Sequence, residues 1–152
     1  MKPRALLVLA GMFLAAAGPA AAMRFSFDCV NERYISKPVG QSHQFRAPIQ
    51  EIPPGDQLVE VTFKPHIPDS WTVQWTQHST GLTYYGTQQI VLAAGYLDRL
   101  EIDFFPDPST PGQGWVDLTI RSVVDPYERT RCTFTLFSGM PVPAVDFEIN
   151  CL

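Results

Sequence analysis

The chain has 152 residues, of which 45% are hydrophobic and 17% are charged. This length suits one domain that buries a core of its own. The chain carries 15 acidic residues against 11 Lys and Arg residues, which argues against a nucleic-acid partner, because binding to phosphates requires a basic face.

Residues 1–22 have the pattern of an export signal. Lys2 and Arg4 precede an apolar stretch from Ala5 to Ala17, and small residues end the segment at Ala22, as signal peptidase requires. The stretch is shorter than the roughly 20 apolar residues of a membrane-spanning helix. We therefore expect a secreted or periplasmic protein without a membrane span. Its mature part, from residue 23, would keep nine basic and 15 acidic residues, a net charge of −6.

All three cysteines, Cys29, Cys132 and Cys151, lie in the part expected to be exported, where disulfides form. Their number is odd, so the default is one bridge and one remaining thiol. Each cysteine shares a face of its predicted strand with apolar residues, and this alternation does not decide which two pair. We favour a Cys29–Cys151 bridge that ties the two ends together, with Cys132 buried and inert.

Apolar residues at every second position predict β-strands along most of the mature chain. Prolines and glycines between the runs predict turns, and no segment has the 3.6-residue period of a helix. In chain order the predicted strands are 25–30, 58–64, 71–77, 90–92, 97–105, 115–123 and 130–137, with 81–86 as a loop or short edge strand. A short segment around Phe45 lies between the first two. The residues expected to form the core are Val59, Val61, Phe63, Trp71, Val73, Trp75, Leu118, Ile120, Phe134 and Leu136.

Seven or eight strands with turns at these intervals predict an all-β fold, an immunoglobulin-like antiparallel β-sandwich, over residues 23–138. Residues 139–152 are interpreted as a Pro-rich linker and a terminal strand. The terminal run Phe147–Cys151 matches Phe25–Cys29 in form. This leaves two interpretations, a terminal strand that pairs near the first strand or the start of a second copy of the unit.

Several turn and core positions resemble one known group of domains. They are Pro68–Val73 with its P-x-x-W start, Leu92–Gly95, Ile102–Pro106, Gly112–Gly114 and Arg121–Pro126. In this order they resemble bacterial immunoglobulin-like accessory domains of the CARDB and alpha-galactosidase-associated type, which are appended to secreted hydrolases and surface proteins. The turn at 92–95 departs from the pattern, because no Pro precedes its glycine. The resemblance implies a non-catalytic structural or adhesive module and carries over no active-site residue.

The histidines do not form a metal-binding motif. His43, His66 and His78 have none of the short spacings that are typical of zinc or copper ligands. We expect surface histidines beside turns and no cofactor.

One arrangement of acidic residues could be catalytic. Glu101 and Asp103 share a strand face, and Asp117 is expected on the matching face of a neighbouring strand, where carboxylates could frame a glycosidic bond. Charges on the solvent face of a sandwich are the simpler interpretation. No Gly-x-Ser-x-Gly motif is present, so we predict no catalytic residue and no enzyme activity.

Exposed aromatic residues are the remaining indication of function. Trp115 shares a face with Asp117 and is expected to point outward, and Tyr84, Tyr85 and Tyr127 lie in or beside loops. Such rings stack on sugars or anchor protein partners. We predict a secreted, non-catalytic interaction, adhesion or spacer module whose partner is a protein or carbohydrate at the cell surface. Two alternatives stay open: a carbohydrate-binding module that uses Trp115 and the Tyr84–Tyr85 loop, and a small exported enzyme or metal-binding protein.

Overall fold

The computed structural model describes residues 26–27, 33–50, 55–93, 98–125, 127 and 129–143. These residues form ten strands and no helix. In chain order the strands are β1 (Ser26–Phe27), β2 (Tyr34–Lys37), β3 (His43–Gln50), β4 (Gln57–His66), β5 (Thr72–Gln77), β6 (Leu82–Tyr84), β7 (Gln88–Leu92), β8 (Arg99–Phe105), β9 (Gly112–Ser122) and β10 (Arg129–Ser138). The expected export signal and terminal strand lie outside this part of the chain. Within it, no helix is long and apolar enough to cross a membrane.

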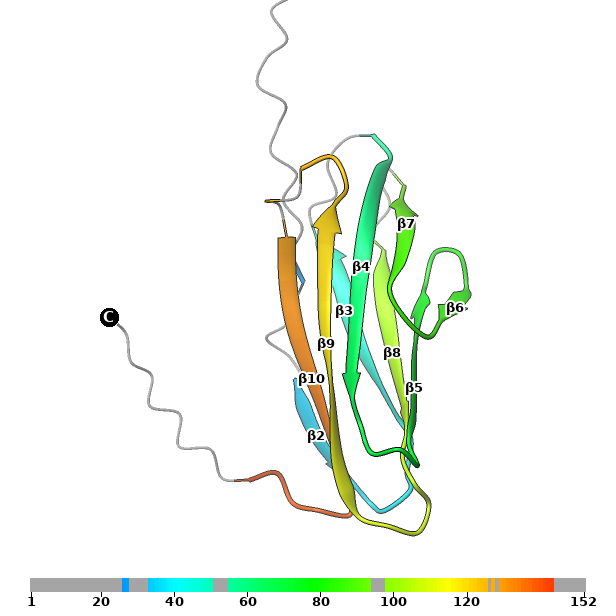
Figure 1. Cartoon of the computed structure of the whole chain (residues 1–152), viewed down its shortest axis with the longest axis vertical. Coiled ribbons are helices and arrows are strands. Elements are labelled where there is room, and N and C mark those ends of the chain that lie inside the picture. Colours follow the sequence, from blue (N-terminus) through cyan, green and yellow to red (C-terminus); the bar gives the residue numbers. More distant parts are fainter. Residues whose placement is uncertain are drawn as a thin grey trace, which may run out of the picture.

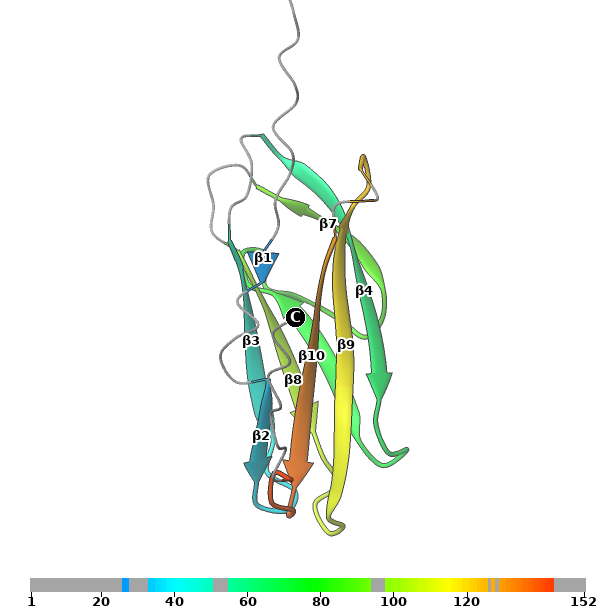
Figure 2. The same ribbon diagram turned by 90° about the vertical axis from the view of Figure 1, so that its left-hand side faces the viewer.

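The strands form two five-stranded sheets that pack as layers (Figures 1 and 2). The first sheet has the order β1-β3-β8-β5-β6, and the second has the order β2-β10-β9-β4-β7. Neighbouring strands run antiparallel, except that β2 runs parallel to β10. This arrangement is an immunoglobulin-like β-sandwich, so the predicted all-β fold class is confirmed.

Side chains from the inner faces of both sheets fill the space between the layers. Phe45 of β3 packs edge-on against Phe104 of β8, with ring centroids 5.5 Å apart, and contacts Phe134 of the opposite sheet at 5.3 Å. Trp75 is fully buried, and its indole N–H donates to the Gly86 carbonyl at 2.9 Å. Each such ring removes on the order of 200 Å² from water, so the aromatic residues contribute most to sheet packing. The residues named above as the expected core, from Val59 to Leu136, are all buried.

The N-terminal part contains more strand than the sequence pattern indicated, which raises the total from the predicted seven or eight to ten. β2 lies in a polar stretch and is stabilised by its parallel pairing with β10, while Ile35 packs against the core. β3 has eight residues rather than a short segment around Phe45. Its length follows from the inward alternation of Phe45, Ala47 and Ile49, all of which are buried.

β9 begins at Gly112, three residues before the strand predicted at 115–123. Both Gly112 and Gly114 pair with β10. Their missing side chains let the Trp71 indole lie directly on β9, because a Cβ at Gly114 would stand 2.9 Å from Trp71 Cζ3 and 2.8 Å from Ile67 Cγ2. Glycine inside a strand often marks such a close approach.

Gly114→Ala is expected to lower the free energy of unfolding by about 1–3 kcal/mol, because an added methyl group overpacks the contact with Trp71. Gly86→Ala is the matched control, since a Cβ there would meet nothing within 4 Å. Urea titration of both variants measures the difference. Equal stability of the two variants would show that Trp71 is not packed against β9.

Candidate functional site

Polar side chains from several strands converge on the outer face of the second sheet. Three adjacent strands, β4, β9 and β10, bring together residues that alternate with the core residues and therefore point away from it. They line an open groove of about 690 Å³, here named the β4–β9–β10 groove. Its lining residues are Glu60, Thr62, Lys64, His66, Asp117, Thr119, Arg121, Arg129 and Arg131.

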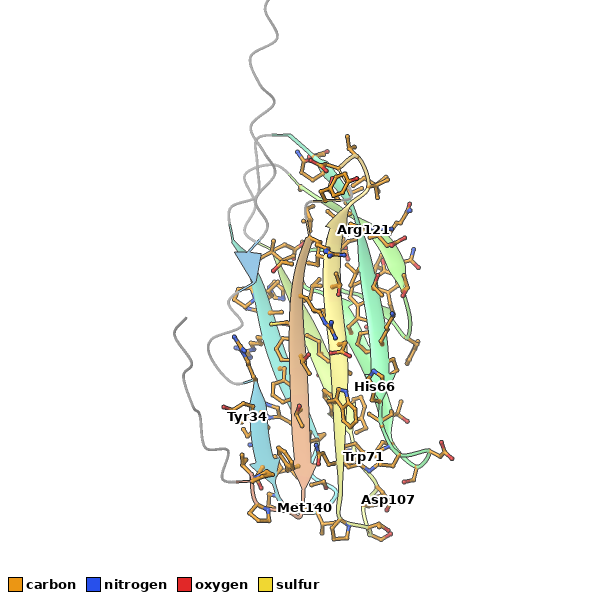
Figure 3. The ribbon with its side chains drawn as sticks, turned by 60° about the vertical axis from the view of Figure 1, so that its left-hand side comes forward. Tyr34, His66, Trp71, Asp107, Arg121 and Met140 are labelled. Atoms are coloured by element: carbon orange, nitrogen blue, oxygen red, sulfur yellow. The ribbon has the colours of Figure 1, made fainter. Side chains whose placement is uncertain are left out.

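The register of the strands explains how these residues meet. On β4 and β9, Glu60 lies opposite Arg121 and Lys64 lies opposite Asp117. β10 then adds Arg131 on the other side of β9, where it lies opposite Thr119, two residues along the strand from Asp117. Figure 3 shows this face, with Arg121 near the upper end of β9 and His66 on the lower part of β4.

The groove is positively charged in an acidic protein. It holds four of the 11 Lys and Arg residues but two of the 15 Asp and Glu residues. With His66 neutral its net charge is therefore +2, whereas the rest of the chain carries −6. A concave surface lined by one excess sign of charge concentrates ligands of the opposite sign.

Asp117 lies at the centre of the groove. Thr133 Oγ1 donates to its Oδ1 at 2.6 Å, Arg131 Nη2 lies 3.2 Å from Oδ1, and His66 Nε2 lies 3.3 Å from Oδ2. Partial burial raises the pKa of this carboxyl, but the Thr133 hydrogen bond and the Arg131 charge outweigh burial and hold the pKa below its ordinary value of 3.8. Asp117 is therefore ionised at neutral pH and poorly suited to act as a general acid.

The second carboxylate of the groove is also paired. Arg121 Nη2 donates to Glu60 Oε1 at 2.7 Å. Lys64 and Arg129, in contrast, have no ion-pair partner among the described residues. Among the described residues, the excess positive charge of the groove therefore lies on Lys64 and Arg129.

Trp115 lies at the lower end of the groove, where the sequence analysis expected an outward aromatic residue. Its ring stacks on the His66 imidazole, with centroids 5.0 Å apart and planes 15° from parallel. Trp115 keeps 38% of its surface exposed. The cationic groove thus ends at a partly exposed aromatic ring.

The structure does not bring Tyr84 and Tyr85 to Trp115. Tyr84 belongs to β6 in the first sheet and packs on the buried Trp75, with ring centroids 4.6 Å apart. Tyr85 follows it and is 68% exposed. The candidate aromatic residues therefore do not form one binding surface.

The expected grouping of Asp117 with Glu101 and Asp103 is wrong. β8, which carries Glu101 and Asp103, pairs with β3 and β5 in the first sheet, whereas β9 lies in the second. Alternation within strands could not reveal which strands are neighbours. Glu101 instead binds Arg99 Nε at 2.8 Å and His78 Nδ1 at 3.2 Å.

The three histidines lie in separate environments. His43 packs edge-on against Phe45, His66 lies in the groove and His78 contacts Glu101. Across the described ranges, no group of three or more His, Cys, Asp and Glu side chains is placed to hold a metal ion.

Cys132 lies in β10, where its side chain is buried. Cys29 and Cys151 lie outside the described residues, so the disulfide stays a prediction. β1 ends at Phe27, two positions before Cys29, and it contacts β10 as well as β3.

One comparison with a solved structure, the N-terminal domain of PorA, supports the architecture. No protein family matches the chain, and no curated protein matches it.

The N-terminal domain of PorA superposes with a TM-score of 0.51 at 12% identity, over 71% of this chain and 87% of that chain. The PapD-like domain 7 of human CEP192 gives 0.43 at 12% identity, over 76% and 84%. CfaE, the adhesive subunit of the CFA/I fimbria of enterotoxigenic Escherichia coli, gives 0.45 at 11% identity, over 79% and 49%. At these identities the similarity concerns the fold alone, and the narrower CARDB-type assignment stays a prediction.

Asp117→Asn is expected to make stability less sensitive to acid. Because the folded-state pKa of Asp117 is lowered, the unfolded chain binds a proton first as the pH falls. The stability that Asp117 contributes is thus present above about pH 4 and is lost as the pH falls through the folded-state pKa. The neutral amide lacks this contribution, so unfolding free energy should fall less between about pH 5 and about pH 2 in the variant.

Chemical denaturation at several pH values measures this difference. Asp107 keeps its own acid dependence in both proteins, because hydrogen bonds from Ser109 lower the pKa of its carboxyl independently of the groove. An identical pH dependence for wild type and variant would contradict the assigned role of Asp117.

Proposed function

We propose that this protein is an exported, non-catalytic interaction module that binds an anionic partner through the β4–β9–β10 groove. The observation that carries the proposal is the charge of the groove, +2 on a chain that is otherwise acidic. A rigid sheet holds these side chains in fixed register, so the surface is preorganised and loses little entropy on binding. The accessory-domain resemblance of the sequence agrees with a module of this kind.

A carbohydrate-binding module is the second candidate. It is favoured by Trp115, whose exposed ring adjoins hydroxyl and charged groups in the groove. An aromatic platform beside hydrogen-bonding groups is a common way to hold a sugar ring. Tyr84 and Tyr85 do not contribute to this version of the site, because they lie with the first sheet.

Binding to immobilised polyglutamate and polygalacturonate tests the groove. The protein should bind one of these polymers at low ionic strength despite its net negative charge, and salt should weaken the binding. Lys64→Glu and Arg129→Glu should each weaken it by about fivefold, since an exposed charge contact is worth up to about 1 kcal/mol.

Arg46→Glu is the matched control, because Arg46 is exposed on β3 in the first sheet. This variant has the same change in net charge and should bind almost as wild type does. Equal losses in all three variants, or no binding to either polymer, would contradict the assignment of the groove.

Export and disulfide formation are part of the same proposal. Mass spectrometry of the secreted protein should give an N-terminal peptide that begins at Met23, because residues 1–22 form the export signal. A non-reduced digest should link Cys29 to Cys132, since β1 contacts β10. A Cys29–Cys151 link would agree with the prediction from the sequence and would reject the Cys29–Cys132 pairing. A secreted protein that still carries residues 1–22 would contradict the proposed cleavage of the export signal.

A further inference from the structure

The β4–β9–β10 groove is bounded at its upper end by exposed apolar residues. Leu58 lies opposite Val91 on β7, and the Val123 N–H donates to the Leu58 carbonyl at 3.1 Å. Val124 and Tyr127 follow in the β9–β10 connection and are 83% and 93% exposed. We name these five residues the upper apolar row. Large apolar side chains that gather on a surface mark interaction sites more often than isolated ones do.

Side-chain hydrogen bonds hold the described residues beside Val124 and Tyr127. The Asp125 N–H donates to Ser122 Oγ at 3.1 Å, and the Tyr127 N–H donates to Asp125 Oδ1 at 3.1 Å. Side-chain hydrogen bonds of this type fix turns. The turn therefore presents two apolar side chains to solvent, where they make no contribution to the core.

The lower end of the groove is apolar as well. Beyond the stack of Trp115 on His66, the register continues through Thr135 of β10 to Tyr34 of β2, which Figure 3 shows on the same face. A second pocket of about 250 Å³ lies here. It is lined by Tyr34, Gln113, Thr135, Phe137, Val142 and Pro143.

The distance between the two apolar ends defines the length of the ligand. Leu58 and His66 are eight residues apart on β4, which is roughly 26 Å at about 3.3 Å per residue. An extended polypeptide of about eight or nine residues covers this distance.

The combination of a cationic centre and two apolar ends distinguishes between ligand classes. An acidic polysaccharide would pair with Lys64 and Arg129 but has no apolar groups to place against Leu58, Val91 and Val123. A polypeptide can supply both kinds of contact, because apolar side chains anchor interfaces and charged groups set their orientation.

We infer that the groove binds an extended acidic segment of a partner protein, with one apolar side chain against the upper apolar row and a second against Trp115 and the Tyr34 pocket. This inference rests on the proposed function and specifies its ligand. Acidic side chains between the two anchors would face Lys64, Arg129 and Arg131.

Selection from a phage-displayed library of random dodecapeptides on the immobilised mature protein tests the inference. Enriched peptides should carry a net negative charge and two apolar residues about eight positions apart, a spacing that follows from strand geometry. Enriched peptides that are neutral or basic would overturn the inference, and so would acidic peptides without the paired apolar positions.

Variants then test the contacts with a synthetic copy of the most enriched peptide. Lys64→Glu should weaken its binding about fivefold, and Tyr127→Ser and Val124→Ser about threefold each, since isolated surface contacts are worth about 1 kcal/mol or less. Leu82→Ser is the matched control, because Leu82 is an exposed apolar residue on β6 of the first sheet. Unchanged binding in both the Tyr127 and Val124 variants would reject the upper anchor.

The polymer experiment separates failure of the inference from failure of the proposed function. Binding of polygalacturonate that depends on Lys64, together with no enrichment of acidic peptides, would retain the groove as a binding site and reject a polypeptide ligand. Absence of binding to any anionic probe would reject both.

Discussion

Burial of one apolar face of each sheet against the other is the interaction on which the rest of the structure depends. The rings of Phe45, Phe104 and Phe134 join the two layers, and Trp75 is buried within the first sheet with its N–H bonded to Gly86. Because side chains alternate along a strand, each buried residue places its neighbours on the outside. The position of the groove residues is thus a direct consequence of core packing.

The fold also buries the polar side chain of Asp98, which needs hydrogen-bond partners in the interior. Asp98 is buried, and its carboxylate accepts hydrogen bonds from Gln77 Nε2, the Ser79 N–H and hydroxyl, and the Arg99 N–H. A buried charge is costly unless it is bonded in this way. This cluster joins the end of β5 to the start of β8.

Much of the fold could be predicted from residue alternation, but the candidate site could be predicted only in part. Alternation placed Trp115 and Asp117 on an outer face, because these residues alternate with Val116 and Leu118 along one strand. It could not assign Lys64 or Arg131 to the same surface, since that depends on the pairing of β4 and β10 with β9. The same lack of pairing information led to the incorrect grouping of Glu101 with Asp117.

The sequence by itself determined that the chain forms a two-layer β-structure and which side chains lie inside, because a period of two is a local property of each strand. Only the tertiary structure decided which outward residues are neighbours. Strand order and register arise from contacts between segments as distant as Glu60 and Arg121, and local patterns carry no information about such pairing. The cationic groove, the upper apolar row and the stack of Trp115 on His66 all belong to this second kind of information.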